Sequence, residues 1–186
     1  MTTANKITIL RIILIPVFMA FMIIGGSFGV TAALITFILA SVSDFLDGYI
    51  ARNYNQISDF GKFMDPLADK MLTTAAYLVL LEQGRITWLG SVCIMLILTR
   101  EFAVSGLRML AAGNNNVIAA SMFGKVKTVS QMVAIIAAQI LMYENIFPQT
   151  TAIIITNLLV WISVIITVIS GIDYLWKNKE VFTKTK

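Results

Sequence analysis

The chain has 186 residues, of which 58% are hydrophobic and only 13% are charged, and its formal net charge is +4. Soluble domains are about half apolar and about a quarter charged, so this composition and a mean hydropathy of +0.85 predict one membrane-embedded domain over residues 1–186. The absence of histidine and the single cysteine exclude histidine catalysis and a disulfide framework, and the scattered basic residues predict no nucleic-acid partner.

Six apolar runs follow one another along the chain. Each reaches or approaches the ~20 residues that a helix needs to cross a hydrocarbon core of about 30 Å. The runs lack the alternation of β-strands, so we predict an all-α integral membrane protein with six transmembrane helices. Asn5 or Thr8 is expected to cap the first helix, and Gly25-Gly26-Ser27 to form the loop that follows it. The runs cover residues 7–24, 30–50, 63–81, 86–112, 117–143 and 151–175.

The positive charges predict the orientation of these helices. With six crossings both termini lie on one side, and 13 of the 14 Lys and Arg residues lie at or near that side, Arg85 being the exception. Because Lys and Arg concentrate in cytoplasmic loops, we predict a multi-pass protein of the cell membrane with both termini in the cytoplasm.

Four aspartates near the predicted cytoplasmic ends of the second and third helices need an explanation, because ionised groups beside hydrocarbon are costly without cations or partners. Asp44 and Asp47 are spaced i, i+3, and Asp65 and Asp69 are spaced i, i+4, so each pair shares a helix face. A hairpin of the two helices would gather the four carboxylates, whose repulsion calls for divalent cations. Oxygen ligands favour Mg²⁺, Mn²⁺ or Ca²⁺, and two bridged ions suit displacement at phosphorus.

Small residues lie between these aspartates. Gly48, Ala51 and Gly61 leave room for a ligand to approach the backbone, and Arg52 could offer a planar fork to a phosphate. The competing interpretation is a set of interfacial salt bridges between the aspartates and neighbouring cations. Those cations are Arg52, Lys62 and Lys70.

The stretch from residue 44 to residue 69 resembles the complete signature of the CDP-alcohol phosphotransferase family. In this chain it reads Asp44-x-x-Asp47-Gly48-x-x-Ala51-Arg52, then, after eight residues, Gly61-x-x-x-Asp65-x-x-x-Asp69. The resemblance implies six transmembrane helices, a homodimer, and a cytoplasm-facing site where a CDP-linked lipid or alcohol donates its phosphoryl group to a hydroxyl and releases CMP.

The same resemblance implies a role for each residue of the signature. Asp44, Asp47 and Asp65 would ligate two divalent ions, Mg²⁺ or Mn²⁺, and Asp69 would complete the second metal site and take the proton of the attacking hydroxyl. The cytidine nucleotide would lie against a further set that shares two of these aspartates. That set is Asp44, Asp47, Gly48, Ala51, Arg52 and Gly61.

Three other stretches, residues 5–8 with Arg11, 99–108 and 124–128, resemble the bacterial phosphatidylglycerophosphate synthase branch of the family. That resemblance implies transfer of phosphatidyl from CDP-diacylglycerol to sn-glycerol 3-phosphate, among membrane lipids. Arg100 and Arg108 are eight residues apart, on similar faces of a helix, and with Lys125 they could form a basic pocket for the acceptor phosphate.

Lys127 and the aromatic residues at the ends of the runs are interpreted more simply. We expect Lys127 to be a positive anchor at the membrane surface. An aromatic belt at the two interfaces is expected from Trp88, Tyr143, Tyr174 and Trp176.

Two alternatives to the glycerophosphate acceptor remain open at this point. One is another member of the family: a cardiolipin, phosphatidylinositol-phosphate or phosphatidylserine synthase. The other is a divalent-cation channel or transporter. The grouping of all four aspartates at one end, away from mid-membrane, argues against the transporter.

Overall fold

The computed structural model describes residues 2–53, 59–113, 122–143 and 146–180, and within them the side-chain surroundings except at residues 3–4, 45–53, 59–60, 62–63, 65–66 and 112–113. Nearly all of this described chain is α-helical and none of it is β-strand, so the all-α prediction is confirmed. The helices are α1 (Thr3–Ile24), α2 (Gly26–Asn53), α3 (Asp59–Glu82), α4 (Gly90–Gly113), α5 (Met122–Ile140) and α6 (Gln149–Lys177).

The first two helices form a hairpin with a shorter turn than expected. Gly25 alone separates α1 from α2, and Gly25 and Gly26 have φ values of 66° and 63°, in the left-handed region that favours glycine. Ser27 therefore belongs to α2 and not to a loop. At the other end of α1 the Thr2 side chain accepts a hydrogen bond from the Asn5 backbone N–H at 3.3 Å. Thr2 therefore caps α1, and the expectation that Asn5 or Thr8 would cap it was wrong.

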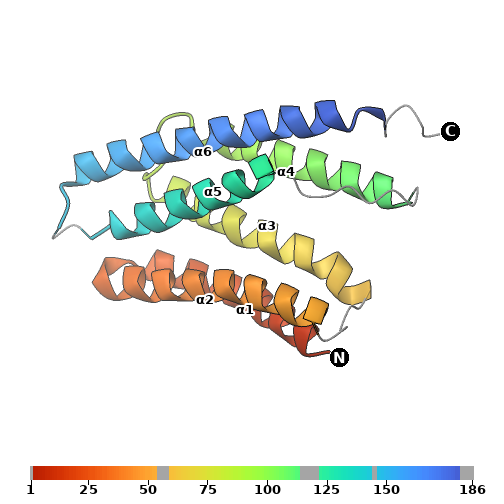
Figure 1. Ribbon diagram of the computed structural model, residues 1–186. Coiled ribbons are helices and arrows are strands. Elements are labelled where there is room, and N and C mark those ends of the chain that lie inside the picture. The colour runs from red at the N-terminus through yellow and green to blue at the C-terminus, as the bar shows by residue number, and fades with distance from the viewer. Residues whose placement is uncertain (1, 54–58, 114–121, 144–145, 181–186) are drawn as a thin grey trace.

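The helices pack as an elongated bundle (Figure 1). The α1–α2 hairpin forms one side, α4 and α6 form the other, and α3 and α5 lie between them. The chain termini lie at the same end of this bundle, which we call the terminal end. The α1–α2 turn and the α3–α4 connection lie at the opposite end, which we call the turn end.

Apolar side chains fill the interior and also cover much of the outside. Phe18, Phe37 and Tyr77 are almost fully buried, whereas Phe28 is 73% exposed and Ile172 is 62% exposed. Apolar exposure on this scale is costly in water and favourable in lipid. Four helical segments are long and apolar enough to cross a membrane, so the chain is a multi-pass membrane protein. The segments are residues 5–24, 26–44, 90–111 and 149–177.

The six-span count remains a prediction. Helices α3 and α5 are not among these four segments, because both contain polar residues in their terminal-end halves. Asp69 and Lys70 lie on α3, and Lys127 and Gln131 lie on α5. The polar face of each helix meets other polar groups inside the bundle; Gln131, for example, donates to the Thr167 hydroxyl at 3.0 Å.

Candidate functional site

A fully buried arginine of α1 holds the first aspartate of the signature. The Arg11 Nη1 atom lies 2.6 Å from Asp44 Oδ1, and Arg11 Nε donates to the Ser43 hydroxyl at 3.4 Å. The Arg11 side chain is 0% exposed and the Asp44 side chain 45% exposed. The ion pair therefore fixes the orientation of the Asp44 carboxylate while leaving part of it accessible.

The last aspartate of the signature lies near the first. Asp69 is exposed on α3, and its carboxylate interacts electrostatically with Asp44, as well as with Arg11, Glu101 and Lys127. The hairpin of the second and third helices thus brings Asp44 and Asp69 into one region of the terminal-end half. Two carboxylates in such proximity repel each other unless cations lie close by.

The other residues of the signature are on the same two helices. Asp47, Gly48, Ala51 and Arg52 belong to α2 and Asp65 to α3, but their side chains lie outside the described residues. Gly61 is buried on α3. Among the described side chains, no three Asp, Glu, His or Cys residues come close enough to hold one ion. The described donor set, Asp44 and Asp69, consists of carboxylate oxygens, which suit Mg²⁺ or Mn²⁺.

Lys127 does not act as an anchor at the membrane surface, so that expectation was wrong. Its side chain is only 8% exposed, and its ammonium group donates to Glu101 Oε1 across the α4–α5 interface. Lys70 of α3 makes a similar contact with the Ser105 hydroxyl of α4. Buried charges need partners of this kind, and these partners join three helices beside Asp69.

Both arginines proposed for the acceptor pocket contact α6. Arg100 Nη2 donates to the Ser170 hydroxyl at 2.8 Å, and Arg100 Nε is buried with no hydrogen-bond partner among the described residues. Gly171 makes this approach possible, because a Cβ there would lie 2.6 Å from Arg100 Cγ. Arg108 Nε donates to the Tyr174 hydroxyl at 3.0 Å, with the guanidinium carbon 5.3 Å from the ring centroid.

These contacts change the interpretation of two other residues. Tyr174 is only 2% exposed and packs against Leu107 and Ala111, so the expectation that it belongs to an aromatic belt was wrong. Trp176, by contrast, is 73% exposed, as a belt residue should be. Lys125 is exposed on the first turn of α5, whereas Lys127, two residues later, is buried.

Neither Arg11 nor Glu101 was expected to lie beside the aspartates. A signal was available for Arg11, which is the only charged residue between Ile7 and Ile24 and therefore needs a partner inside an apolar run. Its partner, however, lies 33 residues away on the next helix. The direction of that contact depends on how α1 and α2 are rotated against each other, which apolar patterning does not reveal when both helices are apolar all round.

Comparison with known proteins identifies similar chains of nearly the same length. Residues 1–169 match the family model described as CDP-alcohol phosphatidyltransferase. A Bacillus subtilis protein named CDP-diacylglycerol–glycerol-3-phosphate 3-phosphatidyltransferase is 40% identical over 95% of this chain and 94% of its own length. Proteins of the same name from Rickettsia felis, at 37% identity over 96% of both chains, and from Haemophilus influenzae, at 37% identity over 91% and 89%, are also similar.

Proposed function

This chain belongs to the CDP-alcohol phosphatidyltransferase family, and we propose that it transfers the phosphatidyl group of CDP-diacylglycerol to sn-glycerol 3-phosphate, giving phosphatidylglycerophosphate and CMP. The observation that carries this proposal is the electrostatic interaction of Asp44 with Asp69, from two helices, in a relative of enzymes that bear this activity in their name. The product class makes the protein an enzyme of phospholipid biosynthesis.

In this proposal the four aspartates of the signature would hold two divalent ions, Mg²⁺ or Mn²⁺. The described pair supports it, because Asp44 and Asp69 are oxygen donors of like charge that lie near each other. When bound, such ions neutralise the diphosphate of the donor and polarise the acceptor hydroxyl. Asp47 and Asp65 complete the ligand set, one helical turn from Asp44 and Asp69 in the sequence.

The reaction is a displacement at the phosphorus atom that carries diacylglycerol. The acceptor hydroxyl oxygen forms a bond to that phosphorus, the bond from phosphorus to the bridging oxygen breaks, and the electron pair leaves with CMP. Asp69 takes the proton of the hydroxyl. A carboxylate with an ordinary pKa near ~4 is a weak base, so the orientation of Asp69 and of the hydroxyl has to supply much of the effect.

The nucleotide is proposed to lie against the α2 side of the site. Gly48, Ala51 and Gly61 present little side-chain volume, so the cytidine and its phosphates can approach the helix backbones. Arg52 offers a guanidinium to a donor phosphate, and Asp44 and Asp47 border both the metal ions and the nucleotide.

The acceptor phosphate is proposed to bind near Arg100, Arg108 and Lys125. Two observations support a basic pocket in the terminal-end half. Arg100 Nε has no hydrogen-bond partner among the described residues, and the guanidinium groups of Arg100 and Arg108 both contact α6. Lys125 is exposed and can move toward a ligand. Glu101 pairs with Lys127 and also with Arg100 at 3.4 Å, and both Glu101 and Lys127 interact electrostatically with Asp69, so these charges connect the proposed pocket to Asp69.

The membrane arrangement is also part of the proposal. We infer one domain with six spans, both termini and the site on the cytoplasmic side of the cell membrane, and a homodimer. The supporting observations are the concentration of Lys and Arg at the terminal end and the exposed apolar surface of the bundle.

An acceptor assay tests the function directly. Purified protein with CDP-diacylglycerol and Mg²⁺ or Mn²⁺ should release CMP when sn-glycerol 3-phosphate is added, with one phosphatidylglycerophosphate per CMP. Release that requires serine, inositol phosphate or phosphatidylglycerol, and ignores glycerol 3-phosphate, would identify another synthase of the family. Metal flux in proteoliposomes without a lipid donor would instead support a transporter.

A further inference from the structure

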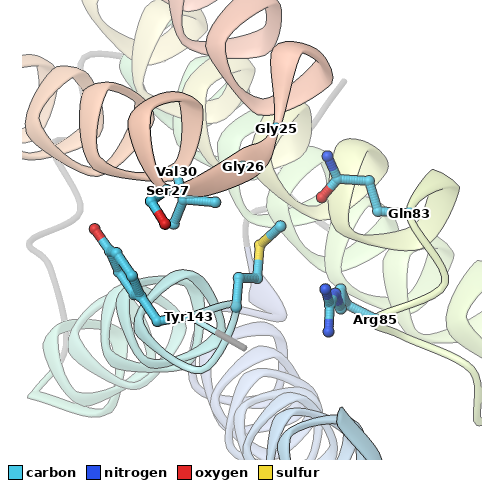
Figure 2. Close-up of a pocket in the computed structure, with 8 residues that line it drawn as sticks. Gly25, Gly26, Ser27, Val30, Gln83, Arg85 and Tyr143 are labelled. Atoms are coloured by element: carbon cyan, nitrogen blue, oxygen red, sulfur yellow. The ribbon is translucent and has the colours of Figure 1, made fainter. Parts of the chain in front are cut away.

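A cavity lies at the turn end, in the half of the bundle away from the aspartates, between the α1–α2 turn, the α3–α4 connection and the end of α5 (Figure 2). Its volume is about 400 Å³. Gln83 and Arg85 line one side, and Ser27 and Tyr143 line the other. A cavity of this size, with a few convergent polar groups, is typical of a small-ligand site.

Arg85 is held in a fixed position beside this cavity. Its backbone N–H donates to the Leu80 carbonyl at 2.9 Å, and its own carbonyl accepts a hydrogen bond from Asn157 Nδ2 at 3.0 Å. Asn157 is fully buried on α6 and also accepts from the Thr87 and Trp88 backbone N–H groups. The connection that carries Arg85 is therefore tied to both α3 and α6, which presents the guanidinium at the cavity.

Gln83 contributes a hydrogen-bond acceptor beside Arg85 in the lining of the cavity. Its Nε2 donates to the Met22 carbonyl, while its Oε1 is buried with no hydrogen-bond partner among the described residues. A buried acceptor in this state is costly unless a ligand or water donates to it. The cavity thus offers a cation and, next to it, an acceptor for a hydroxyl.

The start of α2 adds to the attraction for an anion. Helix α2 begins at Gly26, at the edge of the cavity, where its first backbone N–H groups have no partner within the helix. A guanidinium and a helix N-terminus are groups that bind phosphate.

The surroundings of the cavity are apolar and exposed. Ile23, Ile24, Phe28 and Leu89, all at this end of the bundle, are between 65% and 73% exposed. Two candidate membrane spans also end or begin here, at Ile24 and Gly26, so the cavity lies at the level of a membrane surface. A polar cavity with an apolar rim at this depth fits a phospholipid better than a free phosphate, because acyl chains can cover the rim.

We propose that this cavity binds the headgroup of an anionic phospholipid, with the phosphate at Arg85 and a headgroup hydroxyl donating to Gln83 Oε1. The site is separate from the transfer reaction, which lies in the other half of the bundle. The lipid would join α1, α2, α3 and α5 at the turn end and stabilise the fold.

Thermal unfolding of the full-length protein in detergent tests the proposal. Dioleoylphosphatidylglycerol, which carries a phosphate and free hydroxyls, should raise the Tm by about 5 °C. Dioleoylphosphatidylcholine and inorganic phosphate should each raise it by less than about 2 °C. Arg85→Gln should lose most of the phosphatidylglycerol shift and keep the transfer activity. The matched control, Lys179→Gln, removes the same charge at the terminal end and should keep the full shift.

Three results would overturn the proposal: no shift with phosphatidylglycerol, an equal shift for Arg85→Gln, or an equal shift with phosphatidylcholine. An equal shift with inorganic phosphate alone would show that the cavity binds free phosphate and not specifically a phospholipid. Should Arg85→Gln not fold, Ser27→Leu fills the cavity from an exposed position on α2, and it should likewise lose the phosphatidylglycerol shift. Because transfer activity is measured separately, a failure of the proposed function would leave this test intact.

Discussion

Replacement of Arg11 by methionine tests whether the ion pair with Asp44 prepares the metal site. Methionine keeps most of the buried apolar volume of the arginine stem but removes the guanidinium that lies 2.6 Å from Asp44 Oδ1. Removal of one partner of a fully buried ion pair costs about 3–5 kcal/mol. Since the Asp44 side chain is 45% exposed and can be hydrated, we expect about 1–2 kcal/mol, or a fall in Tm of about 2–8 °C.

The effect on metal use should be larger than the effect on stability. Groups that orient a metal ligand typically change metal affinity or activity by about 10–100-fold when they are removed. The Mn²⁺ concentration for half-maximal CMP release should therefore rise by about that factor in Arg11→Met. Arg11→Lys, which keeps the charge but cannot contact Ser43 and Asp44 together, should give an intermediate value.

The assay is CMP release at saturating CDP-diacylglycerol and glycerol 3-phosphate, with Mn²⁺ titrated. Lys177→Met serves as a matched control, because it also removes the cation of a carboxylate pair, Asp173 at 2.8 Å, but on an exposed helix end. An exposed pair contributes about 0–1 kcal/mol and should not alter the metal requirement. An unchanged Mn²⁺ requirement in folded Arg11→Met would refute the orienting role of Arg11.

Three further predictions concern catalysis, acceptor binding and the fold. Asp69→Asn should nearly abolish transfer while the fold and much of the donor binding remain; retained turnover would remove Asp69 from the role of base. Arg108→Ala should raise the KM for glycerol 3-phosphate more than the KM for CDP-diacylglycerol, and an equal rise in both would count against an acceptor pocket. Asn157→Ala removes the acceptor of the Thr87 and Trp88 N–H groups, whose hydrogen bonds are only partly buried. At a net loss of about 0.5–1.5 kcal/mol per hydrogen bond, the Tm should fall by about 2–12 °C, and a change smaller than about 2 °C would contradict that.

The sequence predicted the helices well because long apolar runs need little context. Their number in the described chain follows from hydropathy and from turn residues such as Gly84, and the predicted ends differ from the observed ones by at most five residues. The bounds that differed depend on local hydrogen bonds. Backbone angles decide whether Thr2 or Asn5 caps α1 and whether Ser27 lies in a loop or a helix. Composition does not reveal these angles.

Only part of the surroundings of the aspartates could be predicted, because a sequence does not reveal in which direction each side chain points. Spacing indicated that Asp44 shares a helix face with Asp47, and Asp65 with Asp69, because i+3 and i+4 positions lie on one face. The proximity of Asp44 to Asp69 followed from the predicted hairpin of the two helices and not from spacing. The environment of Lys127 could not be predicted in that way. An exposed anchor and a buried partner of Glu101 have the same sequence signal, and only the packing of α5 against α4 separates them.

Equilibrium binding of Mn²⁺, followed by electron paramagnetic resonance, tests the central claim that the aspartates hold the ions needed for transfer. The wild-type protein with CDP-diacylglycerol should bind two Mn²⁺ ions per chain, and Asp44→Asn and Asp69→Asn should each lose at least one of them. Wild-type binding in both variants, with their folds intact, would contradict the claim.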